Sequence, residues 1–255
     1  MKRFDELTTE DAARARDEGA VLLLPVGSIE PHGPHLPLST DVLIAEEAAR
    51  RAAGRLEEAG RLALVLPAFV YSTVEFSAGF AGAVGAGAEN AARALSDLLA
   101  ALLGQGFRAV CLVNAHLEPA HLGSLRAAVA SAAERTRRNA IFPDITRRTL
   151  AARLTDEFRS GSCHAGRYET SLVLAVRPDL VREEIRASLP PIDTSLVEAI
   201  QDGRRTFLEA GLDRAYCGDP ASASAEEGED TYEILSEIIA EAVLAELEAP
   251  EPSGH

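Results

Sequence analysis

Three apolar runs alternate with segments of helical periodicity, and this alternation restricts the fold more than any other feature of the sequence. The runs predict short strands buried on both faces: VLLLPV (21–26), RLALVLP (61–67) and FRAVCLVN (107–114). Amphipathic helices are predicted at 41–60, 91–106 and 122–138. Strands that alternate with helices form right-handed crossovers, so the sequence predicts an α/β fold with a mainly parallel sheet and helices on both faces.

Carboxylates and imidazoles gather in the loops after the first and third apolar runs. Glu30 and His32 lie in GSIEPHGPH, Asp41 opens the next helix, and His116 and Glu118 lie in NAHLEPAH. Ligands bind at the carboxyl ends of parallel strands, so both loops are expected at one edge of the sheet. Carboxylate with imidazole suits zinc, manganese or iron, and these five groups are enough for two metal ions that share one carboxylate.

A third cluster, CHAGRYETS (163–171), adds His164 for proton transfer and Glu169 for support. A lone loop histidine is usually a turn residue, but three such clusters at compatible places favour a site. His35 and His121 are expected to orient ligands, to line the pocket or to be purely structural. Cys163 could be a thiol nucleophile, although a small buried residue fits better because nothing in the sequence lowers its pKa.

The rest of the chain gives weaker signals. Residues 71–90, rich in glycine, alanine and serine, predict a long loop near the site, and residues 223–249 predict a closing acidic helix. The tail 251–255 is expected to be frayed, so His255 is not counted as a ligand. No domain boundary is apparent, and residues 1–255 are expected to form a single domain.

Composition excludes several classes of partner. A formal net charge of -15 argues against nucleic acid and anionic membranes, because both would repel the chain. The start of the chain lacks the apolar core of a signal peptide, and no apolar run approaches the ~18 residues of a membrane span. A cytoplasmic location is therefore expected. The three cysteines are far apart without a CxxC pair, so reduced thiols are expected and any metal must use oxygen and nitrogen ligands.

These motifs resemble those of the creatininase family of metal-dependent amidohydrolases. The first metal motif of that family, PVGS-x-E-x-HGPHLPL-x-TD, is similar to residues 25–41. The resemblance then continues, in order, through residues 113–121, 164–181 and 218–229. It therefore extends over nearly the whole chain, and it implies a three-layer α/β/α sandwich that assembles into a homo-oligomer, commonly a hexamer.

The resemblance also implies a set of site residues. Glu30, Asp41 and His116 would hold one divalent metal ion, and His32, Asp41 and Glu118 would hold the other, with Asp41 bridging. The ions would be zinc or manganese, or iron. His164 matches the histidine that handles protons during ring opening, and Glu169 lies in the ETS segment as its supporting partner.

The expected function is a binuclear metal-dependent amidohydrolase. It would cleave the C–N bond of a small cyclic amide, a formamide or a related non-standard amide through a metal-bridging hydroxide, with His164 giving a proton to the leaving nitrogen. Three alternatives stay open: a peptidase of a modified peptide, a non-catalytic metal-binding scaffold, and a cysteine hydrolase using Cys163 and His164.

Two departures from the family pattern bear on the substrate. Creatininase encloses its small ring with tryptophans, whereas this chain has none, and residues 78–85 stand where the family carries F-P-G-T. Both differences point away from creatinine. Cys163 and Arg167 also depart from the pattern; they would either retune the pKa of His164 or offer a cation to an acidic substrate.

Overall fold

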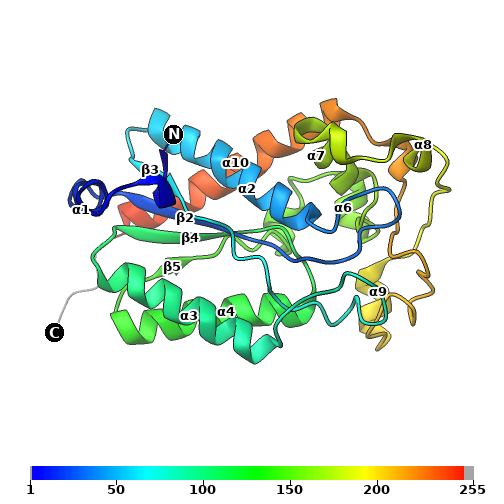
Figure 1. Cartoon of the computed structure of the whole chain (residues 1–255), viewed down its shortest axis with the longest axis horizontal. Helices are drawn as coiled ribbons and strands as arrows, with labels where there is room; N and C mark the ends of the chain where they lie inside the picture. The colour runs from blue at the N-terminus through cyan, green and yellow to red at the C-terminus, as the bar shows by residue number, and fades with distance from the viewer. Residues whose placement is uncertain (1, 250–255) are drawn as a thin grey trace.

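A five-stranded, all-parallel sheet forms the centre of the computed structural model, which describes residues 2–249 (Figure 1). The strands run in the order β1-β3-β2-β4-β5: β1 Lys2–Arg3, β2 Val21–Val26, β3 Ala63–Val65, β4 Ala109–Asn114 and β5 Ala140–Ile141. The three predicted strands are confirmed, although β3 and β4 are shorter than the apolar runs that contain them. The two edge strands, of two residues each, had no counterpart in the sequence pattern.

Helices cover both faces of the sheet. Figure 1 shows α2 (Thr40–Glu58) and α10 (Ala225–Glu248) on one face, and α3 (Ala88–Gly104) and α4 (Pro119–Thr136) on the other. Alternate strand residues supply the two cores: Leu23 packs toward α2 and α10, whereas Leu22 and Leu24 pack toward α3 and α4. This explains why β2 is buried along its whole length, and it confirms the predicted three-layer arrangement.

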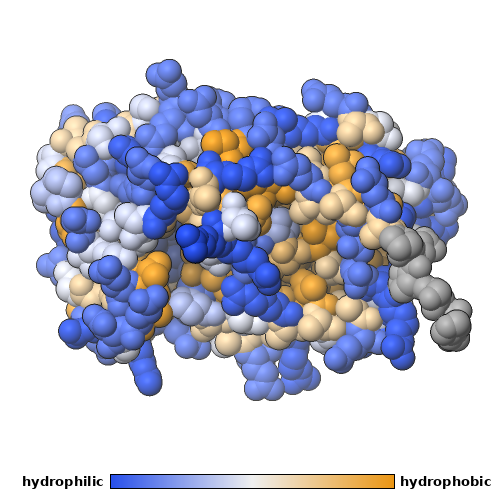
Figure 2. All heavy atoms as spheres, turned by 180° about the vertical axis from the view of Figure 1, so that it is seen from behind, coloured by the Kyte–Doolittle hydropathy of each residue, from blue (hydrophilic) through white to orange (hydrophobic). Residues whose placement is uncertain are grey.

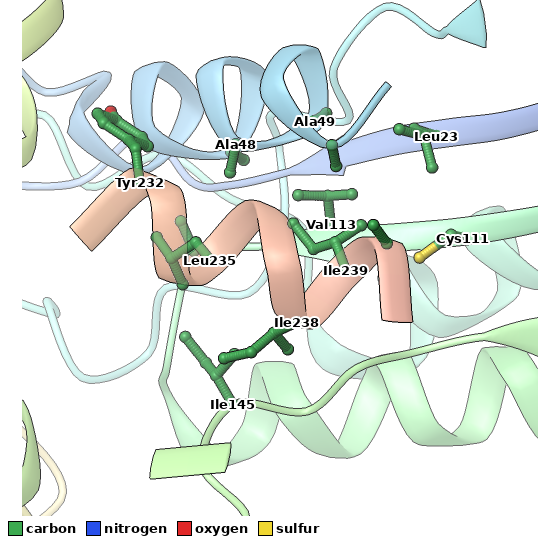
Figure 3. Packing of buried hydrophobic residues seen from close by; sticks show 14 of the residues in the cluster. Leu23, Ala48, Ala49, Cys111, Val113, Ile145, Tyr232, Leu235, Ile238 and Ile239 are labelled. Atoms are coloured by element: carbon green, nitrogen blue, oxygen red, sulfur yellow. The ribbon is translucent and has the colours of Figure 1, made fainter. Parts of the chain in front are cut away.

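The face beneath α10 is packed by aliphatic side chains against alanines. In Figure 3, Leu235 and Ile239 of α10 lie toward Ala48 of α2 and Val113 of β4. Small residues on α2 let the two helices approach closely. Helix α10 also passes close to α7 (Arg167–Val176), where a Cβ on Gly228 would lie 2.0 Å from the Ser171 carbonyl oxygen. Helix α7 is therefore held against the layer that carries the site.

The remaining elements are short. Helix α1 (Thr9–Asp17) packs near the N-terminal edge of the sheet, and the others lie in the connections: η1 Phe4–Glu6, α5 Arg148–Ala151, α6 Asp156–Ser160, η2 Pro178–Leu180, α8 Glu183–Arg186, α9 Leu196–Gln201 and η3 Pro220–Ser222. Figure 1 places α6, α7, α8 and α9 together at the end of the molecule toward which the strands point. These helices enclose the carboxyl edge of the sheet.

Several predicted boundaries shift in the structure. Helix α4 begins at Pro119 instead of Leu122, because proline fits the first turn of a helix, and Glu118 becomes its N-cap. The predicted loop at 71–90 ends at Gly87, since α3 starts at Ala88. The tail that was predicted to be frayed, including His255, lies outside the described residues. Along residues 2–249, no helix is long and apolar enough to cross a membrane.

The outer surface is rich in charged side chains, as the composition of the chain indicates. The face in Figure 2 is mostly hydrophilic, with apolar areas between charged side chains. Ion pairs join neighbouring helices at the surface, for example Arg51 to Glu229 at 2.7 Å and Arg55 to Glu233 at 2.5 Å, both between α2 and α10. Exposed pairs of this kind contribute little to stability individually, so the packing beneath them dominates.

Candidate metal centre

The pairing of β2 with β4 brings the two predicted metal loops together. Val26, the last residue of β2, is in register with Asn114, the last residue of β4, so both loops leave the sheet at the same edge. Gly27 then allows the chain to pass close to the first turn of α2, since a Cβ there would lie 2.7 Å from the Val42 backbone nitrogen. Asp41, in that first turn, is thereby placed between the loops.

Asp41 faces two histidines with two different oxygens. Its Oδ2 lies 3.1 Å from His116 Nδ1, and its Oδ1 lies 3.1 Å from His32 Nε2. Glu30 Oε1 stands beside the first pair, 3.1 Å from His116 Nδ1, and Glu169 Oε2 beside the second, 3.5 Å from His32 Nε2. All five side chains are buried, and among themselves they form two groups able to hold a metal ion: Glu30, Asp41 and His116; His32, Asp41 and Glu169. A further such group joins Glu30 and His32 to His164.

Backbone carbonyls orient both histidines. His32 Nδ1 lies 3.1 Å from the Glu30 carbonyl oxygen, and His116 Nε2 lies 2.8 Å from the Thr73 carbonyl oxygen. A carbonyl only accepts, so each of these nitrogens donates, and the other ring nitrogen is left to face the carboxylates. Ser28 Oγ also donates to Asp41 Oδ2 at 2.6 Å. Such supporting hydrogen bonds fix ligand orientation around metal ions in proteins.

Glu118 lies next to His116 but outside both three-residue groups. Its two carboxylate oxygens accept from the backbone N–H groups of Glu75 and Phe76, each at 3.0 Å. Its Oε2 is 3.7 Å from His116 Nε2, the nitrogen that faces away from Asp41. Glu118 therefore holds the loop before α3, whereas Glu169 is the carboxylate that lies beside His32 and Asp41.

His164 lies against the cluster, as the sequence predicted. Its ring is tilted over the ring of His32 with centroids 4.5 Å apart, and its Nδ1 is 4.0 Å from Glu169 Oε2. Nε2 donates to the Pro31 carbonyl oxygen at 3.0 Å, which leaves Nδ1 as an acceptor. Burial, together with the positive charge of His32, lowers the pKa of His164 to about 4, so the ring is neutral at neutral pH.

The buried charges of the cluster depend on one another. Burial alone would lower the pKa of His32, but the carboxylates of Asp41, Glu169 and Glu30 outweigh it and raise this pKa to about 10. Burial raises the pKa of Glu169 to about 8, against the effect of His32. Buried carboxylates are costly without compensating positive charge. The donor set, which mixes imidazole with carboxylate, fits divalent cations that would replace these protons.

The other two histidines of the described residues, His35 and His121, lie outside both groups. His35 is buried with its Nε2 2.9 Å from Thr170 Oγ1, and burial lowers its pKa to about 4. His121 Nε2 lies 2.7 Å from Asn114 Oδ1, and its Nδ1 is hydrogen-bonded to the Ser72 hydroxyl. His121 therefore braces the loop after β4 against the loop before α3. It supports the cluster without belonging to either three-residue group.

Cys163 and Arg167, the two residues near His164 that differ from the family pattern, lie in different surroundings. Cys163 is buried beside the site, and burial raises the pKa of its thiol well above the usual range. A protonated thiol is a poor nucleophile, so this position disfavours a cysteine hydrolase. Arg167 Nε lies 3.2 Å from Glu227 Oε1 of α10, so its guanidinium is directed to that helix and does not line the cavity beside the cluster.

Glu157 is a supporting residue that the sequence did not reveal. Its carboxylate accepts from the backbone N–H groups of Tyr168 and Asp219, each at 2.7 Å. Gly166 and Gly218 make room for it; a Cβ on Gly218 would lie 2.3 Å from Glu157 Oε1. Because Gly166 has no side chain to cap α7, Glu157 performs that role from α6. The only signals in the sequence are the two glycines, which identify no partner.

Replacing Glu157 with glutamine is expected to destabilise the fold. The amide nitrogen of glutamine cannot accept from a backbone N–H, and the charge favourable to the start of α7 is lost. The free energy of unfolding should fall by about 1–3 kcal/mol, measured by urea denaturation. Glu226→Gln, an exposed carboxylate in the first turn of α10, is the matched control and should change it by about 0.5 kcal/mol or less. Equal effects of the two substitutions would refute the capping role.

A cavity of about 220 Å³ adjoins the cluster. Its polar end contains Glu30, Asp41, His116, Glu118, His164 and Glu169. Its remaining wall is mainly apolar and comes from the loop before α3, the loop after β4, α6, α9 and the turn at Phe207. The cluster is therefore accessible to a small molecule or to part of a larger one.

Comparisons with known proteins agree with this geometry. The family described as "Creatininase: Creatinine amidohydrolase" matches residues 5–243. The chain is 32% identical over 241 residues to the mycofactocin precursor peptide peptidase of Mycobacterium ulcerans (strain Agy99), covering 88% of this chain and 84% of that protein. It is 29% identical over 265 residues to the creatinine amidohydrolase of Pseudomonas putida, covering 94% and 95%.

The same family appears among solved structures. A mutant creatininase described as of Zn-Zn type matches with a TM-score of 0.73 at 25% identity, covering 98% of this chain and 100% of that one. The match of the family over residues 5–243 extends through every segment that carries the buried cluster. The chain therefore belongs to the creatininase family of metal-dependent hydrolases.

Proposed function

We propose that this protein is a binuclear metal-dependent amidohydrolase that cleaves the C–N bond of a non-standard amide. One observation carries the proposal: Asp41 presents its two oxygens to two different histidines, each of which has a further carboxylate beside it. A carboxylate in that position is suited to bridge two cations. The family membership of the chain and the zinc pair named for a creatininase variant support the same reading.

The ligand sets that we propose differ by one residue from those implied by the sequence. Glu30, Asp41 and His116 would hold one ion, and His32, Asp41 and Glu169 the other, with zinc or manganese as the ions that suit these donors. Glu169 is favoured because its Oε2 is 3.5 Å from His32 Nε2. Glu118 Oε2 faces His116 Nε2, the nitrogen directed away from Asp41, at 3.7 Å, and both Glu118 oxygens accept from backbone N–H groups, so its role would be to hold the loop before α3 beside the site.

The proposed reaction gives separate roles to the metal ions, His164 and Glu169. Two divalent cations, when bound, would supply Lewis acidity for the amide carbonyl and lower the pKa of a water molecule to about 7. His164, neutral and with Nδ1 free to accept, would take a proton there and deliver it to the leaving nitrogen. Glu169 beside Nδ1 would stabilise the imidazolium that forms. Burial of the cluster excludes bulk water and strengthens each of these interactions.

The substrate is proposed to be an amide other than creatinine. The chain has no tryptophan with which to enclose a small ring, and the wall of its cavity is formed instead by phenylalanine and aliphatic residues. Cyclic amides, formamides and modified peptides all remain candidate classes. A peptidase activity has support of its own, since the relative from Mycobacterium ulcerans at 32% identity is a precursor peptide peptidase.

The test is a screen with protein loaded separately with zinc and with manganese. Cyclic amides, formamides and short peptides would be supplied, and release of amine or ammonia would be measured. We expect turnover that disappears with a chelator and returns when the metal is restored. Stoichiometric metal without turnover across the panel would contradict the proposal and favour a non-catalytic scaffold.

The pKa shifts predict that metal stabilises the fold more as the pH rises. The pKa of His32 is raised from 6.5 to about 10 and that of Glu169 from 4.5 to about 8, so their protonated forms stabilise the metal-free fold at low pH. This contribution is lost as the pH rises through those values, whereas bound cations need no such protons.

Thermal unfolding of metal-free and metal-loaded protein tests this prediction. Between about pH 6.5 and 8.5 the gap between their Tm values should widen by at least about 4 °C. A gap that stays constant or narrows over this range would show that these groups do not exchange protons for metal.

A further inference from the structure

We propose that the cavity beside the cluster binds an aliphatic or aromatic side chain of the substrate. This inference rests on the proposed hydrolase function and deepens it by naming a substrate class. The wall of the cavity beyond the cluster is formed mainly by apolar side chains from five segments of the chain: Phe76, Leu117, Phe158, Val197, Ile200 and Phe207. An apolar group gains free energy on entering such a cavity, whereas a polar group loses its hydrogen bonds to water.

Phe207 joins the apolar wall to the reacting end of the cavity. Its ring stacks on His164, with centroids 4.4 Å apart and an angle of 27°, and packs edge-to-face on Phe76 at 5.0 Å and 83°. Phe207 and Phe76 are both buried, and the Phe207 backbone N–H donates to the Phe76 carbonyl oxygen at 2.9 Å. The apolar wall therefore starts at the side chain that handles protons. A substrate side chain seated on this wall would hold the amide next to His164.

Helix α9 supplies the outer part of the wall. Val197 is 52% exposed although it lines the cavity, and Ile200 one turn later is half-buried. The helix is fixed to the end of α6, because the Leu196 N–H donates to the Gly161 carbonyl oxygen and Ser195 Oγ donates to that of Ser160, each at 2.9 Å. Apolar side chains thus stand at the mouth of the cavity on a fixed support, where an apolar ligand would shield them from water.

The polar side chains around the apolar part are already engaged. Arg159 donates to the Leu154 carbonyl oxygen at 2.6 Å and is paired with Asp156. Thr146 Oγ1 donates to Asp144 Oδ1 at 2.5 Å. Both side chains thus hold hydrogen bonds within the protein, and most of the wall here is apolar. A polar substrate side chain would be desolvated mainly against apolar groups, so the cavity should select against it.

Pairs of amides of nearly equal size and opposite polarity test the inference. N-acetyl-leucine amide and N-acetyl-asparagine amide place the side chain on the acyl side of the scissile bond, and N-formyl-leucine and N-formyl-asparagine place it on the amine side. With metal-loaded protein, kcat/KM should be at least about tenfold higher for the leucine member of one pair. Equal values within both pairs would overturn the inference while leaving the proposed function intact.

Val197→Asp tests the wall itself. The substitution should lower kcat/KM for the preferred leucine compound by about tenfold and reduce its advantage over the asparagine compound. Leu98→Asp on α3, where the side chain is 43% exposed and does not line the cavity, is the matched control and should change neither value. An unchanged ratio in Val197→Asp would overturn the inference.

A binding measurement keeps the two proposals separable. If the metal-loaded protein hydrolyses none of these compounds, their affinities can be compared by ligand-observed NMR. Tighter binding of the leucine compounds, lost in Val197→Asp, would support the apolar site even though hydrolysis had failed. Equal binding of leucine and asparagine compounds would reject it.

Discussion

Replacing Asp41 with asparagine is expected to lower kcat/KM by about three orders of magnitude or more. The carboxylate faces His116 with one oxygen and His32 with the other, so the substitution removes a charge from both proposed metal sites together. Metal content, measured by mass spectrometry after dialysis, should fall below one ion per chain. An Asp41→Asn protein that kept two ions and full turnover would contradict the bridging role.

Ser28→Ala is the matched control for this substitution. Ser28 Oγ donates to Asp41 Oδ2 at 2.6 Å, so its removal disturbs the orientation of the carboxylate and leaves the charge in place. Metal affinity should weaken by about 10–100-fold, the usual effect of removing a supporting hydrogen bond, and activity should return at saturating metal. Asp41→Asn should not be rescued in this way.

Glu169→Gln and Glu118→Gln are both expected to lower activity, but only Glu169→Gln is expected to lower the metal content. Glu169 lies with His32 and Asp41, so Glu169→Gln should reduce the content to about one ion per chain and lower kcat/KM by about 100-fold or more. Glu118 accepts from the N–H groups of Glu75 and Phe76, so Glu118→Gln should keep both ions. Its activity should still fall, because one N–H would face the amide NH₂ and the loop would shift.

Metal content after dialysis distinguishes the two variants, and circular dichroism checks that both are folded. The resemblance to the creatininase family implied the opposite result, with Glu118 as a metal ligand and Glu169 as a supporting partner near His164. Loss of one ion from Glu118→Gln, with two ions kept by Glu169→Gln, would establish that assignment and reject the one that we propose.

The architecture followed from the sequence because hydrophobic periodicity is a local property. The run 21–26 is apolar on both faces, and the structure covers it on both faces. Edge strands β1 and β5 carry only two residues each, too few for any period to appear. The start of α4 was misplaced because Pro119, read as part of a loop, is in fact its first helical residue.

The members of the cluster were predictable, but their partners were not. Residue types and the carboxyl ends of the strands brought Glu30, His32, Asp41 and His116 to one place. The direction of Glu118 depends on the loop at Glu75, and the approach of Glu169 depends on the packing of α7, both through contacts between distant parts of the chain. The spacing of two residues between His116 and Glu118 carries no information about either contact.

The loop before α3 is attached to the same side chains that we propose as ligands or their neighbours. The Thr73 carbonyl oxygen accepts from His116, Ser77 Oγ donates to Glu30, and the N–H groups of Glu75 and Phe76 donate to Glu118. Ordering of this loop and occupancy of the metal sites are therefore thermodynamically linked, and linkage is reciprocal. Cations would tighten the wall of the cavity, and a substrate that packs on that wall would raise the affinity for the cations by the same factor.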